Sequence, residues 1–174
     1  MFETRPMTGE GDEFYSEVAE QMGYLLKGES NMLANLSNAS ALLNMVLADI
    51  NWVGFYLVQG DELVLGPFQG KPACVRIAVG KGVCGTAVAN RSMLIVPDVL
   101  AFPGHITCDA ASRSEIVVPI YVTDQVIGIL DIDSPTVGRF TQVDGDGLQK
   151  VVYAIEQATD WSDAFAHSEE GPLH

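Results

Sequence analysis

The sequence predicts one α+β domain in which N- and C-terminal helices cover one face of a central six-stranded antiparallel sheet. Two stretches with helical spacing open the chain, short β-rich runs fill its middle, and a further helical stretch closes it. The chain has 174 residues, the length of one domain, and its 48% hydrophobic share is enough for a sizeable core. We therefore expect a single folded unit.

The expected domain lies between two tails. Residues 1–13 are polar and contain glycine, so they are expected to be a flexible N-terminal tail, or an arm over the surface. The folded domain is expected at residues 14–166 and a disordered C-terminal tail at 167–174. Two opening helices are indicated by apolar residues at helical spacing. These are Phe14, Val18, Met22 and Leu25, and then Leu36, Leu43, Val46, Leu47 and Ile50.

Six β-rich runs follow, and they are expected to form one sheet. The turns at residues 59–61 and 123–124 are tight enough to join antiparallel neighbours. Pro119 cannot donate a backbone hydrogen bond, so its strand is expected to lie at an edge of the sheet or to carry a bulge. The expected strands are 52–58, 62–65, 74–79, 93–96, 115–122 and 125–133.

Two more helices are expected after the third strand. Residues 80–82 supply a flexible, glycine-containing entry to a short helix that begins at Val83 or Cys84. Thr141, with Asp144 three residues later, resembles a capping box and predicts the start of the long closing helix.

The charge of the chain excludes two classes of partner. Nine Lys and Arg against 23 Asp and Glu give a net charge of -14, which repels the phosphates of nucleic acids and anionic membrane surfaces. No apolar run approaches the roughly 20 residues that cross a bilayer, and the first residues lack the pattern of a signal peptide. A cytoplasmic location with reduced thiols is expected.

Three cysteines, an odd number, are too few for the disulfide framework of a secreted protein. Cys74, Cys84 and Cys108 all lie near predicted element boundaries, where each is either a small buried apolar residue or a reactive thiol. At a helix N-terminus, Cys84 could have its thiolate stabilised by backbone N–H groups and the helix dipole. Arg113 could stabilise a thiolate at Cys108, whereas Asp109 would oppose it unless it points away.

Two carboxyl groups share one face of the last strand. Asp131 and Asp133 are two residues apart and point to the same side, as do Ile129 and Ile127. A carboxylate pair on an apolar face needs a cationic or protonated partner, unless the strand end is solvated.

Trp52 and Tyr56 are four residues apart on the first strand, so their rings share a face. They are either ordinary core residues or an aromatic wall suited to a sulfur or a methyl group.

Five motifs together resemble those of the free methionine-(R)-sulfoxide reductases, over roughly residues 14–164. They are Asn51-Trp-Val-Gly-Phe-Tyr56, Gly66-Pro-Phe-Gln-Gly-Lys-Pro-Ala-Cys74, Gly80-Lys-Gly-Val-Cys-Gly-Thr-Ala87, Asp109-Ala-Ala-Ser-Arg-Ser-Glu115 and Leu130-Asp-Ile-Asp-Ser134. The resemblance implies a GAF fold and the reduction of the R epimer of free methionine sulfoxide, in oxidative-stress defence and methionine recycling. It implies no cofactor, with thioredoxin as the external reductant. GAF domains often pair through their terminal helices, so a homodimer is compatible with it.

The resemblance also implies roles for individual residues. Cys108 corresponds to the attacking thiol, Cys74 to the principal resolving thiol and Cys84 to an auxiliary one. The proton for the departing oxygen would come from a carboxylic acid with a raised pKa. The substrate-binding residues would be Trp52, Tyr56, Glu115, Asp131 and Asp133.

Two other functions compete with this interpretation. A GAF module can bind a small ligand and signal to a partner, because a fold alone determines no function. A zinc site is the second alternative, with Cys74, Cys84, His105 and Cys108 as ligands. Cys74 and Cys84 are ten residues apart, which is not the spacing of a structural zinc knuckle, so no metal is expected.

Overall fold

Six strands form one antiparallel sheet in the order β3-β2-β1-β6-β5-β4, which confirms the predicted fold class. The computed structural model of the protein describes residues 2–106 and 108–166, so the C-terminal tail expected at 167–174 lies outside the described residues. The strands are β1 (Trp52–Gln59), β2 (Glu62–Gln69), β3 (Arg76–Ala78), β4 (Leu94–Val96), β5 (Ser114–Val122) and β6 (Gln125–Ser134).

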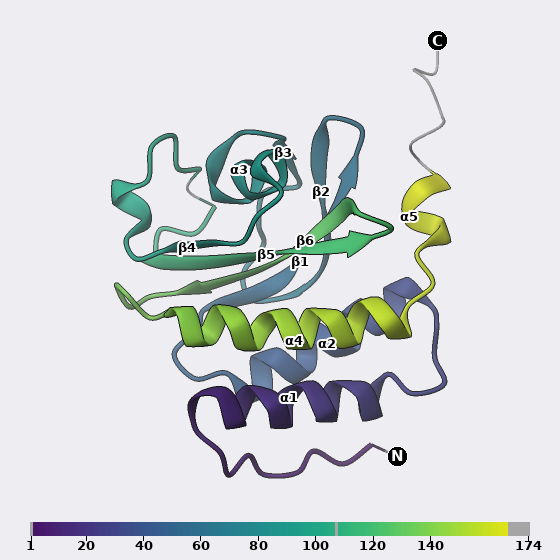
Figure 1. Cartoon of the computed structure of the whole chain (residues 1–174). Coiled ribbons are helices and arrows are strands. Elements are labelled where there is room, and N and C mark those ends of the chain that lie inside the picture. The colour runs from purple at the N-terminus through teal and green to yellow at the C-terminus, as the bar shows by residue number, and fades with distance from the viewer. Residues whose placement is uncertain (1, 107, 167–174) are drawn as a thin grey trace.

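Three helices lie on one side of the sheet (Figure 1). Helices α2 (Met32–Val46) and α4 (Gln142–Ala158) pack against the strands, and α1 (Gly11–Leu25) packs against α4. On the opposite side lies α3 (Gly82–Asn90), together with the long segment between β4 and β5. No helix within the described ranges is both long and apolar enough to cross a bilayer.

The alternation of side chains along the strands creates two separate apolar clusters. Val53, Phe55 and Leu130 face the helices, whereas Trp52, Tyr56 and Ile129 face α3. Successive side chains of a strand point to opposite faces of the sheet, and the predicted faces of these residues were based on this alternation. The α3 side is the one that also carries the polar groups described below.

Strand β2 is longer than predicted, because it continues from Leu65 to Gln69 through Gly66 and Pro67. The pairing between β1 and β2 shifts register between Gly54 and Tyr56, and this irregularity accommodates the proline. Phe68 thereby stacks on Trp52, with ring centroids 5.2 Å apart.

Strand β6 departs from strict alternation at one residue. The β5–β6 register shifts between Ile120 and Tyr121, which leaves Ile127 without a partner in the ladder. Ile127 therefore turns toward the helices, and its predicted place on the face of Asp131 is wrong. Ile129 lies on the predicted face.

The strand of Pro119 is not at the edge of the sheet, because β4 lies beyond it, but the predicted alternative is met by the irregularity between Ile120 and Tyr121. Strand β4 pairs with β5 only as far as Val117, so no neighbour on that side requires a donor from Pro119. On its other side Pro119 lies opposite Ile129 of β6.

Some elements differ from the prediction in their bounds, and two others were not predicted. Helix α1 begins at Gly11 rather than near Phe14, and Cys74 precedes β3 instead of lying in it. The short elements η1 (Val99–Ala101) and α5 (Ser162–Ala166) were not predicted. Such short helices carry too little periodicity to be found in a sequence.

The segment before α1 lies along that helix. The Arg5 N–H donates to Gln21 Oε1 (3.2 Å), and Gln21 Nε2 donates to the Arg5 carbonyl (2.8 Å). The Thr8 hydroxyl donates to Glu17 (3.0 Å). These contacts agree with an arm over the surface. The predicted tail is too long, because residues 11–13 belong to α1, and the flexibility of the residues before them stays a prediction.

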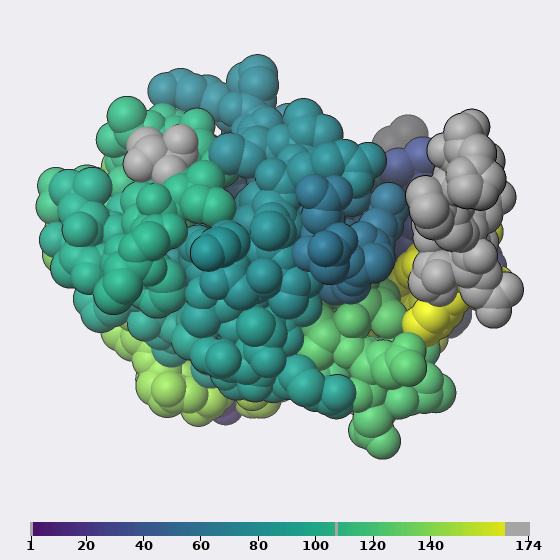
Figure 2. Space-filling view, turned by 90° about the horizontal axis from the view of Figure 1, so that it is seen from above, coloured from purple at the N-terminus to yellow at the C-terminus, as the bar shows by residue number. Residues whose placement is uncertain are grey.

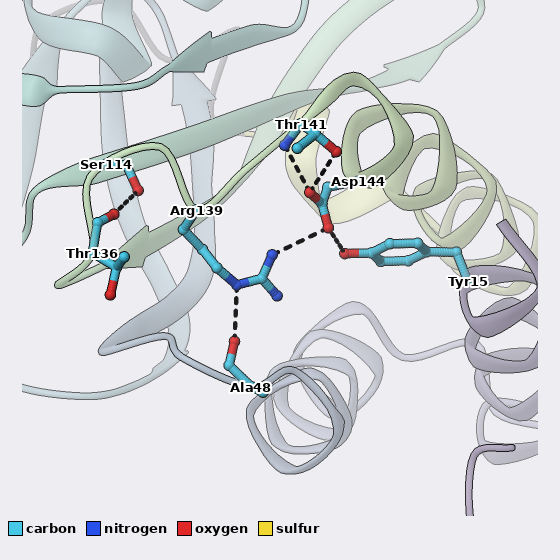
Figure 3. Close-up of polar contacts among 7 residues, drawn as sticks. All are labelled: Tyr15, Ala48, Ser114, Thr136, Arg139, Thr141 and Asp144. Carbon is cyan, nitrogen blue, oxygen red and sulfur yellow. Dashed lines mark hydrogen bonds and ion pairs between the residues drawn. The ribbon is translucent and has the colours of Figure 1, made fainter. Parts of the chain in front are cut away.

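One carboxylate joins three elements on the helical side (Figure 3). Asp144, near the start of α4, accepts hydrogen bonds from the Tyr15 hydroxyl of α1 (2.6 Å) and from Arg139 Nη1 (3.2 Å). Arg139 Nε also donates to the Ala48 carbonyl after α2 (3.1 Å). The Thr141 N–H donates to Asp144 (2.7 Å), which confirms the predicted helix start.

Replacing Tyr15 by Phe should lower the free energy of unfolding by about 1 to 3 kcal/mol, because a hydrogen bond to a charged group is lost in a partly buried site. Urea denaturation followed by circular dichroism measures this. Tyr153→Phe is the control, since Tyr153 lies on α4 with an exposed ring and should change the value by less than about 0.5 kcal/mol. Equal effects of the two variants would contradict the role of Asp144.

Candidate active site

A pocket lies on the α3 side of the sheet, between the strands and two covering segments. Its floor is formed by side chains of β1, β5 and β6, and one wall by residues 81–84 at the start of α3. Residues 71–73, before β3, and residues 105–112, before β5, contribute further lining, although residue 107 lies outside the described chain. Figure 2 looks onto this face, where teal α3 and the teal-green segment before β5 cover the sheet.

The two covering segments are joined by a disulfide between Cys74 and Cys108. These residues are 34 apart in sequence, and their Cα atoms are 5.7 Å apart. Cys108 is exposed and lines the pocket, while Cys74 is half-buried. Because the two sulfur atoms are bonded to each other, they cannot both serve as thiolate ligands in this state, which removes the basis of the four-ligand zinc site.

The predicted aromatic pair lines the pocket and also holds one of the covering segments. The rings of Trp52 and Tyr56 are stacked, with centroids 6.0 Å apart, and both are buried. The Tyr56 hydroxyl donates to the Cys74 carbonyl (2.9 Å), and Trp52 Nε1 donates to the Lys71 carbonyl (3.1 Å). The pair is therefore both core and pocket wall, and it positions the backbone at Cys74.

Cys84 is the one cysteine outside the disulfide, and the expectation of a stabilised thiolate there is wrong. Its Sγ is buried near the start of α3 and donates to Glu115 Oε1 at 3.4 Å. Burial raises the pKa of this thiol well above its usual value, and the neighbouring Asp131 and Glu115 raise it further. These effects outweigh the helix N-terminus, so Cys84 is a poor nucleophile in this environment.

The packing of α3 explains how Cys84 reaches the floor. A side chain at Gly85 would place its Cβ only 2.4 Å from the Ala78 carbonyl oxygen, so only glycine allows this close approach. The Gly85 carbonyl then accepts from the N–H of Gly80 (2.8 Å).

Three carboxyl groups meet beside Cys84. Asp133 lies directly opposite Glu115 in the β5–β6 ladder, and Asp131 shares its face of the sheet. Burial, reinforced by the charge of Asp133, raises the pKa of Glu115 to about 8. Burial, reinforced by Glu115, likewise raises the pKa of Asp131 well above its usual value. Burial, reinforced by Asp131 and Asp109, also raises the pKa of Asp133.

The prediction that Asp131 and Asp133 would need a cationic or protonated partner is met by Glu115, which lies beside them with a raised pKa. Near neutral pH, a proton on Glu115, whose pKa is about 8, avoids the cost of a second buried negative charge beside Asp131. Within the described ranges, Asp131 Oδ1 is buried and has no hydrogen-bond partner, so it is available to a ligand.

Cys84, Glu115 and Asp131 could also hold a metal ion, because one ligand atom from each lies within 4.8 Å of the others. One sulfur and two oxygen ligands would suit zinc. Each group would first have to lose a proton that the site favours. We assign no metal to this site.

Strand β5 is fixed at the residue before Glu115. The Ser114 hydroxyl donates to the Thr136 carbonyl (2.6 Å), which ties the start of β5 to the chain beyond β6 (Figure 3). This contact anchors the backbone beside the Glu115 carboxyl.

Several pocket residues were not predicted as site residues. Lys71, Asp109 and Ser112 line the pocket beside the disulfide, and all three lie within the motifs that carried the resemblance. His105 lines it as well, and burial lowers its pKa. Arg113, predicted to stabilise Cys108, instead pairs with Asp98 at 3.6 Å.

Known proteins agree with the fold and with the motifs. The GAF domain family matches residues 13–159 of the chain. The free methionine-R-sulfoxide reductase of Escherichia coli is 55% identical over 157 residues, which cover 88% of this chain and 95% of that relative. The chain belongs to the free methionine-R-sulfoxide reductase family of GAF domains.

Solved structures of the family superpose closely on the protein. A free methionine-R-sulfoxide reductase from Neisseria meningitidis, in complex with its substrate, gives a TM-score of 0.87 at 41% identity and covers 91% of this chain and 95% of its own. The reduced form of fRMsr of Staphylococcus aureus gives a TM-score of 0.81 at 55% identity, covering 83% and 94%. The resemblance inferred from the sequence motifs is thereby confirmed.

The raised pKa of Glu115 predicts how stability depends on pH. Folding raises this pKa from 4.5 to about 8, so its stabilising contribution is complete below pH 4.5 and is lost as the pH rises to about 8. Glu115→Gln should reduce the loss of unfolding free energy between pH 5 and 8 by about 1 to 4 kcal/mol, since one pKa unit corresponds to ~1.4 kcal/mol.

Urea denaturation of the disulfide-bonded protein at several pH values tests this expectation. Keeping the Cys74–Cys108 bond intact prevents those two thiols from adding to the titration. If the free energy of unfolding changed with pH in the same way in Glu115→Gln and in the original protein, the raised pKa of Glu115 would be contradicted.

Proposed function

We propose that this protein reduces free L-methionine-(R)-sulfoxide to L-methionine, using a sulfenic acid on Cys108 and a disulfide to Cys74 that thioredoxin reduces again. The observation that carries the proposal is the disulfide beside a pocket whose floor holds the Glu115 carboxyl, with its pKa raised to about 8. The family relationship points to the same reaction, because the E. coli relative is a free methionine-R-sulfoxide reductase.

In the first step, the reduced Cys108 attacks the sulfoxide sulfur. Glu115, with a pKa of about 8, carries the proton that the sulfoxide oxygen needs in order to leave its sulfur. Oxygen passes to Cys108, which becomes a sulfenic acid, while the sulfoxide is reduced and methionine is released. Cys108 suits this role because it is exposed beside the pocket, whereas Cys84 is buried and holds its proton.

In the second step, the Cys74 thiol attacks the Cys108 sulfenic acid. A sulfur–sulfur bond forms, the sulfur–oxygen bond breaks, and water leaves with the proton of the thiol. The product is the Cys74–Cys108 disulfide of this structure. Cys84 would then be an auxiliary thiol. Its hydrogen bond to Glu115 would help to orient the carboxyl group that donates the proton.

The pocket is suited to a free amino acid. Asp131 Oδ1, unpaired among the described residues, and Asp133 would receive the α-ammonium group, which a peptide-bound residue lacks. Trp52 and Tyr56 would contact the S-methyl end. Lys71 and Lys81 also line the pocket and would attract the carboxylate.

Regeneration would use an external dithiol. Exposure of Cys108 allows a thiolate of thioredoxin to attack this sulfur, and a second exchange releases reduced protein. This cycle requires a reducing compartment, in agreement with the predicted cytoplasmic location. Homodimer formation remains a prediction from the GAF fold.

The first experiment follows both epimers of free methionine sulfoxide in the presence of reduced protein and dithiothreitol or thioredoxin. Only the R epimer should disappear, and Cys108→Ser should lower the rate at least about 1,000-fold because no sulfenic acid can form. Cys84→Ser is the matched control and should retain R-specific turnover within about tenfold. Chiral chromatography of the remaining sulfoxide measures how much of each epimer every variant has consumed.

The result for Cys108→Ser also tests the choice of nucleophile. R-specific turnover that survives in this variant would move the attack to Cys84. No turnover of either epimer by fully reduced protein would contradict the enzyme and favour a module that only binds a ligand.

Glu115→Gln tests the proton donor. This variant should lower kcat by about 100-fold or more, within the range that a general acid supplies. The rate of the original protein should fall as the pH rises through about 8, because Glu115 then loses its proton, and this decline should be absent in the variant.

Glu156→Gln is a suitable control, because Glu156 is a partly buried glutamate on α4 whose pKa is also raised by burial. It lies outside the residues that line the pocket. A kcat for Glu115→Gln equal to that of Glu156→Gln would assign the proton to another group.

A further inference from the structure

We propose that Asn51 is a positioning residue that holds the Cys108 segment against the sheet, so that Cys108 meets Cys74. The proposal deepens the function proposed above and rests on it, since disulfide formation is the step that Asn51 would serve. Asn51 does not line the pocket and is absent from the residues assigned to the reaction so far.

The first step of the argument is that Asn51 is anchored to the sheet. It immediately precedes β1, and its backbone N–H donates to the Asp133 carbonyl of β6 at 2.9 Å. The backbone of Asn51 is therefore fixed at the centre of the sheet, where β1 and β6 are joined over six residue pairs.

The second step is that the side chain reaches the Cys108 segment. Asn51 Nδ2 donates to Asp109 Oδ2 at 3.2 Å and to Ser112 Oγ at 3.1 Å. Both NH₂ hydrogens are therefore used on the segment that carries Cys108, and one contact is to the residue next to it.

The third step is that Asp109 extends these contacts to the Cys74 segment. Its carboxylate lies 3.6 Å from Lys71 Nζ and accepts the N–H of Ala111 at 2.9 Å. The Lys71 carbonyl in turn accepts from Trp52 Nε1 at 3.1 Å. Polar contacts therefore join the same two segments as the disulfide, and a reduced protein can keep them when the disulfide is broken.

The physical reason for such contacts is the length of the segment. Seventeen residues, 97–113, separate β4 from β5, and the described part contains only the three residues of η1 as regular structure. Closing a flexible segment onto a fixed thiol costs entropy, so a prior attachment raises the effective concentration of one thiol at the other.

The test measures the equilibrium of the Cys74–Cys108 disulfide with a buffer of reduced and oxidised glutathione. In this exchange two glutathione thiols reduce the protein disulfide and become one glutathione disulfide. Asn51→Ala should lower the equilibrium constant for disulfide formation about tenfold, which corresponds to about 30 mV in reduction potential. Alkylation followed by mass spectrometry gives the oxidised fraction.

Asn35→Ala is the matched control. Asn35 is a buried asparagine on the helical side, and its Nδ2 donates to the Glu29 carbonyl and to Thr159 Oγ1, both at 3.1 Å. Its loss should lower the stability of the fold and leave the glutathione equilibrium within about twofold of the original protein. A purely structural role of Asn51 would give the same result as Asn35.

Two outcomes overturn the proposal. The first is an unchanged glutathione equilibrium in folded Asn51→Ala. If that variant does not fold, Asp109→Ala takes its place, because it removes both the ion pair with Lys71 and the carboxylate that accepts from Asn51 Nδ2. An unchanged equilibrium there overturns the proposal as well.

The readout separates this proposal from the proposed function. The glutathione equilibrium involves no methionine sulfoxide, so it tests Asn51 even if the protein releases no methionine. When methionine is released, a single turnover of reduced Asn51→Ala should leave at least about three times more Cys108 sulfenic acid for dimedone to trap, because condensation with Cys74 is slower.

Discussion

The cost of charging buried carboxyl groups governs the chemistry of the pocket. Glu115 and Asp131 lie on the otherwise apolar α3 face of the sheet, close to each other and to the Cys84 thiol. Ionising all of these groups would place several negative charges in a poorly solvated space. Burial instead raises the pKa of each group, and it raises that of Glu115 to about 8, so Glu115 holds its proton near neutral pH.

The cost of burying negative charge also makes the cysteines chemically different from one another. Cys84, beside the carboxyl groups, keeps its proton, whereas Cys108 lies at the exposed side of the pocket. A proton donor and a nucleophile need opposite environments, and the pocket supplies them on its floor and at its opening. The proposed direction of attack therefore follows from burial.

The two aromatic residues connect the floor with the opening. Trp52 and Tyr56 belong to the apolar cluster on the α3 side, and their polar atoms hold the backbone at Lys71 and Cys74. Asn51, directly before Trp52 in the chain, donates from its side chain to the carboxylate of Asp109. The start of β1 therefore contacts both segments that carry the disulfide, so residues 51–56 can place the two cysteines relative to the substrate.

The amino-acid sequence by itself determined the fold class, the six strands and the family. Side chains alternate along a strand by local geometry, so the shared face of Trp52 and Tyr56, and that of Asp131 and Asp133, could be predicted. The sequence could not place Ile127 or the end of β2, because both depend on irregular pairing with a neighbouring strand. The cysteine motifs likewise identified the three thiols, and the pairing of Cys74 with Cys108 came from the resemblance and not from their spacing.

Only the tertiary structure decided the environment of each group. The start of a helix favours a thiolate at Cys84 when the local sequence is considered alone, but burial beside Glu115 and Asp131 reverses that expectation. The contacts of Asn51, Asp109 and Lys71 join three distant parts of the chain, so no local pattern could indicate them. Periodicity is a property of neighbours in sequence, whereas desolvation and charge depend on neighbours in space. The proposed roles of Cys108 as the reacting thiol and Glu115 as the acid rest on these neighbours in space.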